Sequence, residues 1–374
     1  MAKATLKHRD RIVRSINLQE TDRCPIDFGG TNVTSITEGA YKKLTNLLKI
    51  DGNFNYMSKK NRIVCPSEHI LKMFDIDTRP ILPGSPDYWQ TKFDSEGAYI
   101  DEWKVKWRPN VDGRYVLDKP PLKEATKCDL DKFDWPITND PGRIRGLKKK
   151  ASEMHQNTDY AIILSLPSGI IHQCQYLRGF SEYLIDIMVN KSFARIFTEK
   201  VEEVWSRMAE QVLEEVAGYV DVVLYADDVG IQDNCMFSPD IYREIIKPSH
   251  KRIMTMIKEA TGAKLLYHTC GSVVPLIDDF IELGVDVLNP IQITAKNMEP
   301  KLLKERFGEK LAFWGGIDTQ KLLPFRSKED VEFNVKKMVR VLGDNGGYIL
   351  ASVHNIQDDT NPENIITMLK TSLG

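Results

Sequence analysis

The sequence predicts an α/β fold, a (β/α)₈ barrel that forms one domain over residues 1–374. The first observation is a rhythm in the C-terminal half, where a glycine ends each helix and a near-continuous apolar strand follows at once. The second is that these strands end in polar residues or glycines, as barrel strands do at the active-site face. An open doubly wound sheet is the alternative.

Seven segments fit the strands of such a barrel. In chain order they are residues 24–30, 160–169, 219–228, 263–270, 285–292, 309–318 and 348–355. The less regular stretch between the first two segments has room for an eighth strand. Two helix starts are marked by Ser238 and Asn361, capping residues that each precede a first-turn proline. Ser327 with Asp330 fits a variant capping box at a third.

The stretch 51–158 departs from this rhythm. It carries four of the six tryptophans and many turn signals. Residues 101–108 alternate like a hairpin strand, with Trp103, Val105 and Trp107 on one face. We interpret the stretch as an insertion packed over the barrel, which serves as a lid or as an oligomer contact such as a homodimer interface.

The composition describes an ordinary globular protein, with 42% hydrophobic and 28% charged residues. The formal net charge of −2 offers no basic surface, which argues against nucleic acid as a partner. No apolar run approaches the length of a membrane span, and the N-terminal residues lack a signal-peptide core. Because the six cysteines show no paired spacing, we expect a reduced, cytoplasmic setting.

His268 and Cys270 are the most informative pair in the chain. They close the apolar run 264–271, and side chains two apart on a strand point to the same side. An imidazole and a thiolate are ligands that zinc prefers. The alternative is a packed histidine beside an ordinary buried cysteine.

Seven further residues near strand ends are candidate site residues. The catalytic candidates are Asp227 and Asp228, and the substrate-binding candidates are Asn289, Gln292, Asp318, Tyr225 and Trp314. Each has a structural alternative, because acids and amides also cap helices and loops and aromatic rings also fill barrels.

Four other polar positions receive structural interpretations. Asp77 and Arg79 are expected to form an ion pair with each other. His172 and His250 lie outside the set of strand-end residues, so we expect them to be surface or packing residues.

The motif His-Thr-Cys-Gly at 268–271, with the runs that follow it, resembles the uroporphyrinogen decarboxylase superfamily. The runs are LGVDVLNPIQ, FGEKLAFWGGIDTQ and GGYILASVHNIQDDTNPENI, joined by the N-terminal DRCPIDFGG and the central YADDVGIQDNCMFSPDIYREIIKP. The resemblance implies a (β/α)₈ barrel. The superfamily contains porphyrinogen decarboxylases and also methyltransferases that serve corrinoid proteins.

Two details of the resemblance favour the methyltransferase branch. The decarboxylases carry an N-terminal signature with arginines that meet substrate carboxylates, whereas residues 27–30 here read Asp-Phe-Gly-Gly. The His-x-Cys pair belongs to the zinc methyltransferases, whose third ligand is typically a cysteine in the last strand. The matching residue here is His354, so the resemblance implies a zinc site of His268, Cys270 and His354.

The resemblance implies transfer of a methyl group between a small substrate and the cobalt of a separate corrinoid protein, with zinc activating the substrate. The sequence contains no Asp-x-His-x-x-Gly cobalamin motif, so a partner must carry the corrinoid. The Trp-rich insertion and the aromatic residues near strand ends favour a methoxylated aromatic substrate and O-demethylation. The alternatives are a metal-free lyase that uses Asp227 or Asp228 with His354 as acid and base, and a non-catalytic binding member.

Overall fold

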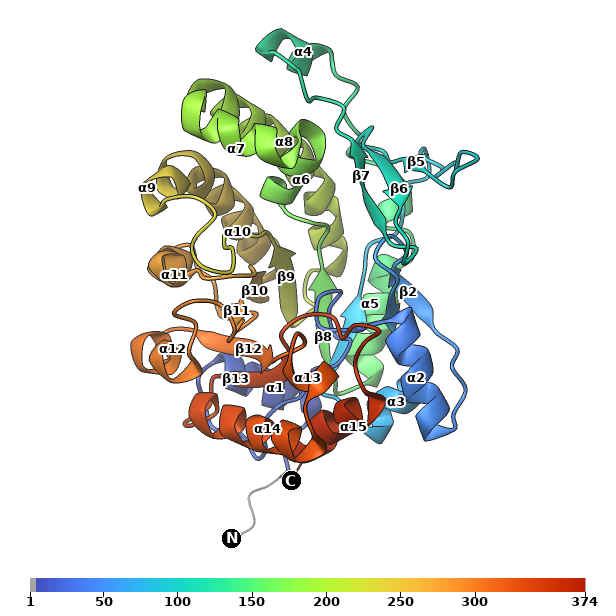
Figure 1. Cartoon of the computed structure of the whole chain (residues 1–374), viewed down its shortest axis with the longest axis vertical. Helices are drawn as coiled ribbons and strands as arrows, with labels where there is room; N and C mark the ends of the chain where they lie inside the picture. Colours follow the sequence, from blue (N-terminus) through green and yellow to red (C-terminus); the bar gives the residue numbers. More distant parts are fainter. Residues whose placement is uncertain (1–4, 374) are drawn as a thin grey trace.

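The computed structural model describes residues 5–373, in which a seven-stranded parallel sheet curls inside a layer of helices (Figure 1). In sheet order the strands are β4 (Thr78–Ile81), β8 (Ala161–Ser165), β9 (Val222–Ala226), β10 (Lys264–His268), β11 (Val287–Asn289), β12 (Ala312–Ile317) and β13 (Tyr348–Ser352). All neighbours pair in parallel, as successive βα units require.

Residues 25–27 close this sheet into a barrel. The N–H of Asp27 donates to the carbonyl of Leu350 in β13 at 2.9 Å, and the N–H of Leu350 donates to Pro25 at 2.9 Å. On the other side, the N–H of Asp77, just before β4, donates to the carbonyl of Ile26 at 3.0 Å. The segment therefore takes the place of a strand between β13 and β4, and the predicted barrel is confirmed.

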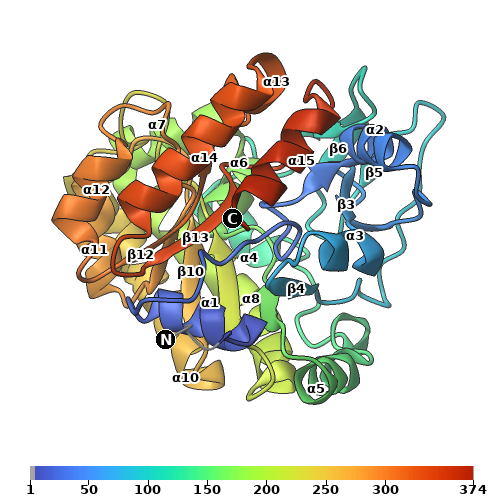
Figure 2. The same cartoon turned by 90° about the horizontal axis from the view of Figure 1, so that it is seen from below.

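The barrel interior is filled by alternate side chains of the strands. The apolar residues that share it are Ala161, Ile163, Val222, Leu224, Leu266, Val287, Ala312, Trp314, Ile349 and Ala351. Ile12 and Ile16 of α1 (His8–Ile16) join this cluster. Figure 2, which views the molecule from below, shows α1 lying across the near end of the barrel. The other end, where the strands have their carboxyl termini, is the one at which barrel enzymes carry their active sites.

Helices cover the outside of the sheet. The longer ones are α5 (Leu147–Asn157), α6 (Ile170–Arg178), α7 (Phe180–Val189), α8 (Lys191–Val216), α10 (Lys247–Thr261), α12 (Pro300–Phe307), α14 (Lys328–Leu342) and α15 (Pro362–Thr371). Shorter ones are α3 (Glu68–Met73), α4 (Lys127–Lys132), α9 (Pro239–Ile241), α11 (Ile277–Glu282) and α13 (Leu322–Phe325), while α2 (Glu38–Leu48) packs on α15. Within residues 5–373, no helix is long and apolar enough to cross a membrane.

The predicted helix starts are confirmed by their hydrogen bonds. The Ser238 side chain accepts from the N–H of Ile241, and the Asn361 side chain accepts from the N–H of Glu363. Ser327 and Asp330 form the reciprocal capping box that their spacing predicts.

The stretch 51–158 contains both barrel elements and extra structure. Its barrel elements are β4 and α5. The boundaries predicted for the insertion, residues 51–158, therefore include residues that belong to the barrel. The extra part includes the sheet β5 (Tyr99–Ile100), β6 (Lys106–Pro109) and β7 (Tyr115–Lys119), and a sheet of β1 (Ile36–Thr37), β2 (Asn55–Ser58) and β3 (Ile63–Cys65) begins ahead of it. Trp103, Val105 and Trp107 are all buried, as the alternating pattern predicts.

Asp77 and Arg79 do not form the predicted ion pair with each other. The buried Asp77 carboxylate binds Arg11 at 2.5 Å and Arg23 at 2.7 Å, whereas Arg79 binds Glu68 at 2.8 Å. The prediction was wrong because Arg11 of α1 and Arg23, just before the segment 25–27, both reach Asp77. One consequence is that Asp77 ties three separate segments together at the closed end of the barrel.

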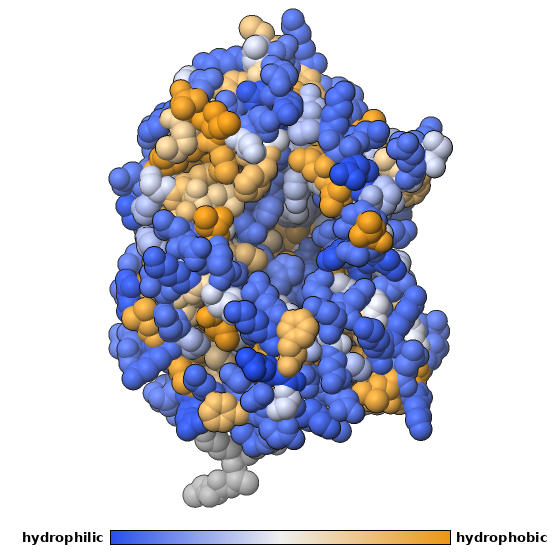
Figure 3. All heavy atoms as spheres, in the orientation of Figure 1, coloured by the Kyte–Doolittle hydropathy of each residue, from blue (hydrophilic) through white to orange (hydrophobic). Residues whose placement is uncertain are grey.

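An exposed apolar patch lies on α7. Figure 3 shows hydrophobic side chains gathered over this helix, where Ile185, Met188 and Val189 are all exposed. Patches of this kind are typical of contact surfaces. The patch lies outside residues 51–158, where we expected an oligomer contact; that expectation stays a prediction.

Candidate metal centre

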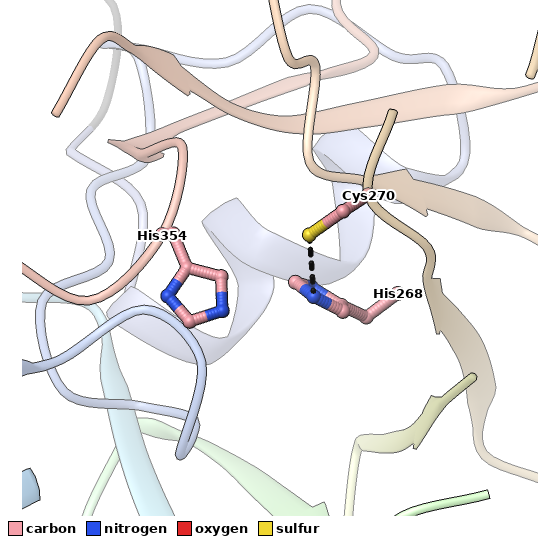
Figure 4. A group of neighbouring side chains, drawn as sticks. All are labelled: His268, Cys270 and His354. Atoms are coloured by element: carbon pink, nitrogen blue, oxygen red, sulfur yellow. Dashed lines mark hydrogen bonds between the residues drawn. The ribbon is translucent and has the colours of Figure 1, made fainter. Parts of the chain in front are cut away.

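His268, Cys270 and His354 meet at the open end of the barrel (Figure 4). His268 is the last residue of β10, Cys270 follows two residues later, and His354 comes just after β13. One ligand atom from each lies within 4.8 Å of the others, and His268 Nε2 is 3.4 Å from Cys270 Sγ. The strand-end positions therefore bring together two nitrogens and a sulfur, a donor set that suits zinc.

A hydrogen bond orients the His268 ring for metal binding. Its Nδ1 lies 2.5 Å from Asn289 Oδ1, and the Asn289 amide nitrogen donates to the carbonyl of Trp314 at 3.0 Å. Because Asn289 uses its N–H there, its oxygen accepts the hydrogen of His268 Nδ1. Nε2 is then left with a free lone pair toward Cys270, the tautomer a metal ligand needs. Asn289, a substrate-binding candidate, is itself fully buried.

The His354 ring presents a different tautomer. The N–H of Asn355 donates to His354 Nδ1 at 2.8 Å, so a neutral ring carries its hydrogen on Nε2. Burial, with His268 nearby, lowers the pKa of His354 to about 4, so the ring is neutral at pH 7. Its other nitrogen faces His268 and Cys270 in Figure 4. His354 can therefore donate to a bound group as it stands, and can bind metal through Nε2 only after losing that hydrogen.

Burial sets the charge of the other two groups. It lowers the pKa of His268, and burial together with the Asp228 carboxylate raises the pKa of the Cys270 thiol. Both groups are therefore neutral without a cation. A bound cation would favour the thiolate, with release of a proton.

Asp228 is the carboxylate nearest to this cluster. It accepts the N–H of Cys270 at 2.7 Å and lies 3.5 Å from His172 Nε2. Burial acts to raise the pKa of Asp228, but the His172 imidazole lowers it well below the usual range. Asp228 is thus an ionised group that fixes the backbone of Cys270.

Asp227 is turned away from the cluster and is fully buried. It accepts the N–H groups of Ile171 at 2.9 Å and His172 at 3.1 Å at the start of α6, and the Tyr225 hydroxyl at 3.0 Å. Burial acts to raise the pKa of Asp227, but His172 and His250 beside it lower the pKa to about 2. These contacts correspond to the helix-capping alternative.

His172 and His250 were interpreted as surface or packing residues, and for His172 this was wrong. Its Nδ1 lies 3.2 Å from Asp227 and its Nε2 3.5 Å from Asp228. Although burial disfavours its charge, these two carboxylates raise the pKa of His172 well above the usual value. His250 is fully buried, with Nε2 3.1 Å from Asp227. One feature of the sequence could have indicated this position: His172 lies three residues after Gly169, which ends the predicted strand and precedes the first residue of α6.

Of the four remaining candidates, Gln292 contacts the segment that carries Cys270, and the other three have structural contacts elsewhere. Gln292 accepts the N–H of Gly271 at 2.8 Å and alone among them is not buried. Asp318 accepts three backbone N–H groups of the turn that follows, which is the capping alternative. Trp314 lies inside the barrel and donates to Asp27 at 2.9 Å. Tyr225 lies between the sheet and the helices, so its ring does not face the open end.

Comparisons with known proteins give a family and a fold. A family model described as "Uroporphyrinogen decarboxylase (URO-D)" matches residues 132–372. A solved structure described as "methyltransferase from Methanosarcina mazei" is similar over 98% of each chain, with a TM-score of 0.66 and 14% sequence identity. At this identity the likeness concerns the fold. A search of curated proteins finds no significant sequence match.

Xylanase structures give weaker matches. Xylanase 10B from Thermotoga maritima is 11% identical, with a TM-score of 0.35 over 63% of this chain and 91% of that one. Xylanase 10B from Thermotoga petrophila RKU-1 is 12% identical, with a TM-score of 0.34 over 69% of this chain and 100% of that one. Similarity at this level carries no functional inference.

Proposed function

Because the chain belongs to the uroporphyrinogen decarboxylase (URO-D) family, we propose that it is a methyltransferase within that family. It would move a methyl group between a small substrate and the cobalt of a separate corrinoid protein. The observation that carries the proposal is the cluster of His268, Cys270 and His354 at the open end of the barrel. The methyltransferase from Methanosarcina mazei, whose fold is similar, supports the reaction class.

The donor set fits zinc, and one change is needed if His354 is the third ligand: its Nε2 must lose a hydrogen. His268 Nε2 and Cys270 Sγ would hold the ion, and Asn289 and Asp228 keep these two ligands in position. Bound zinc would polarise the oxygen of a methyl ether or alcohol and so weaken its C–O bond. His354 would act as the third ligand after loss of the Nε2 hydrogen or, with the tautomer described above, as an N–H donor to the substrate oxygen.

The proposed methyl donor is a methoxylated aromatic, and the methyl acceptor is cob(I)alamin on the partner protein. Decarboxylation of a tetrapyrrole polyacid is less well supported. Asp27, in the segment where the decarboxylases carry arginines, is fully buried and accepts hydrogen bonds from Thr34 and Thr78. A carboxylate in this position offers no clamp for the carboxylates of such a substrate.

Metal content and methyl transfer test the proposal together. We expect about one zinc per chain, and we expect Cys270→Ala to lose it while Cys128→Ala, at an exposed cysteine, keeps it. Supplied with a corrinoid protein reduced to Co(I) and a methoxylated aromatic, the wild type should convert the Co(I) spectrum to that of methylcobalt. Zinc-independent decarboxylation by the isolated chain would refute the proposal in favour of a metal-free lyase.

The variant His354→Ala separates the two roles of this residue. Loss of zinc together with activity would identify His354 as a ligand. Retention of zinc with a large loss of methyl transfer would identify it as a donor to the substrate oxygen. Full zinc and full activity would remove His354 from the proposed site.

A further inference from the structure

A cavity lies between the extra segment of the chain and the barrel helices. Its volume is about 200 Å³, and it lies between β6, α6 and α8, whose places are seen in Figure 1. Four aromatic side chains contribute to its walls: Trp103, Trp107, Tyr176 and Trp205. None of the three proposed metal ligands lines it.

Two buried donors in this cavity have no partner. Arg143 Nη1 and Gln173 Nε2 form no hydrogen bond with any described atom, although their residues are only 5% and 7% exposed. Both residues line the cavity. A buried donor without an acceptor costs about 1–3 kcal/mol, so a ligand that supplies acceptors would be favoured here.

Lys60 adds a third donor and a positive charge. Its Nζ lies 3.0 Å from the centre of the Trp107 ring and 4.4 Å from that of Tyr176. No carboxylate of the described residues forms an ion pair with it. Burial lowers the pKa of Lys60 to about 7, against the raising effect of Asp101. With no such partner, the Lys60 amine is only partly protonated near pH 7, and a bound anion would favour its charged form.

The acceptors of the cavity are already in use. The Asp101 carboxylate accepts the Trp107 indole N–H at 2.7 Å and the N–H groups of Trp103 and Val105. The other carboxylate, Glu102, binds Arg143 and the hydroxyl of Tyr88. Among the described residues that line the cavity, the buried side-chain atoms left without a partner are thus both donors, which favours a ligand that supplies acceptors, such as an anion.

We propose that this cavity binds a small aromatic carboxylate, with the ring among the aromatic walls and the carboxylate toward Lys60, Arg143 and Gln173. The volume lies below the roughly 300–1,000 Å³ of drug-sized pockets, so it suits a ligand of about one ring. Aromatic walls favour a planar ring over an aliphatic acid. The ligand is of the same class as an acidic methoxylated aromatic, but its binding in this cavity requires no methyl transfer.

Binding to the full chain stripped of zinc tests the inference separately from the proposed function. Benzoate is titrated by calorimetry, with benzamide as the neutral ring and acetate as the anion without a ring. We expect about one benzoate site per chain and at least about tenfold weaker binding of both comparison compounds, as loss of one hydrogen bond to a charged group implies. No benzoate binding, or equal binding of benzamide, would overturn the proposal.

Substitutions then locate the site. Lys60→Met removes the amine but keeps a long unbranched side chain, one atom shorter, and should weaken benzoate binding about tenfold to a hundredfold. Lys59→Met, at the exposed neighbour, is the matched control and should bind like the wild type. Gln173→Leu provides a second test from α6, with folding of each variant checked by circular dichroism. Unchanged affinity in folded Lys60→Met and Gln173→Leu proteins would refute the assignment.

Discussion

Replacing His172 by glutamine should destabilise the protein strongly, because this imidazolium sits between two carboxylates. The variant loses a contact of 3.2 Å with Asp227 and one of 3.5 Å with Asp228. Removing one member of a buried ion pair costs roughly 3–5 kcal/mol. Asp227 keeps His250 and Tyr225 as partners, and the His172 side chain is 23% exposed. We therefore expect a fall of about 2 kcal/mol in the free energy of unfolding, below this range.

The pH dependence of this difference has a definite sign. The pKa of His172 is raised on folding, so its contribution is complete below its unfolded value of 6.5 and is lost as the pH rises through the folded value. The pKa of Asp227 is lowered to about 2, so its contribution is complete above its unfolded value of 3.8 and is lost as the pH falls toward 2. The difference between wild type and variant should therefore be largest between pH 4 and 6.5.

Urea unfolding followed by circular dichroism measures this effect at several pH values. His69→Gln, at an exposed histidine, is the control and should stay within about 0.5 kcal/mol of the wild type. A loss of less than about 1 kcal/mol in His172→Gln at pH 5.5, or a difference that does not vary with pH, would show that the imidazole is not charged there.

Three further changes have defined outcomes. Asn289→Leu removes the acceptor for His268 Nδ1 and should weaken zinc binding about tenfold to a hundredfold, measured by competition with a chelator. Equal zinc affinity would contradict the role of Asn289 in fixing the His268 tautomer. Gly271→Ala places a Cβ 2.5 Å from the backbone of Gly230, so it should lower the melting temperature well below that of Gly262→Ala, which meets open space at a similarly positive φ. Asp77→Asn removes one carboxylate partner from Arg11, which keeps Asp22, and one from Arg23, which keeps Asp75. It should cost roughly 2 kcal/mol by urea unfolding, and a near-neutral result would count against barrel closure through this residue.

The strand ends could be predicted from the sequence because the glycine-to-strand rhythm repeats along the C-terminal half. The period of two along a strand also places His268 and Cys270 on one side, and the two residues do meet. The same period puts Tyr225 beside Val223 on the helix-facing side of β9, away from Leu224. The position of Tyr225 could therefore have been predicted from the alternation of side chains along the strand.

Other features could not be predicted because tertiary contacts decide them. β4 is a short strand whose sequence, Thr-Arg-Pro-Ile, contains a proline and lacks an apolar run. The position of His172 between two carboxylates depends on how α6 docks against the end of β9. The tautomers of His268 and His354 depend on single hydrogen bonds to Asn289 and to the backbone of Asn355.

Closure of the barrel by its first and last strands has a consequence for synthesis on the ribosome. The segment at residues 25–27 has its partner in β13, which is translated near the end of the chain. Until then Ile12, Ile16 and Ile26, all buried in the final fold, lack the strand that helps to cover them. These apolar N-terminal side chains therefore stay without this part of their cover through most of translation, when they are open to contact with other apolar surfaces.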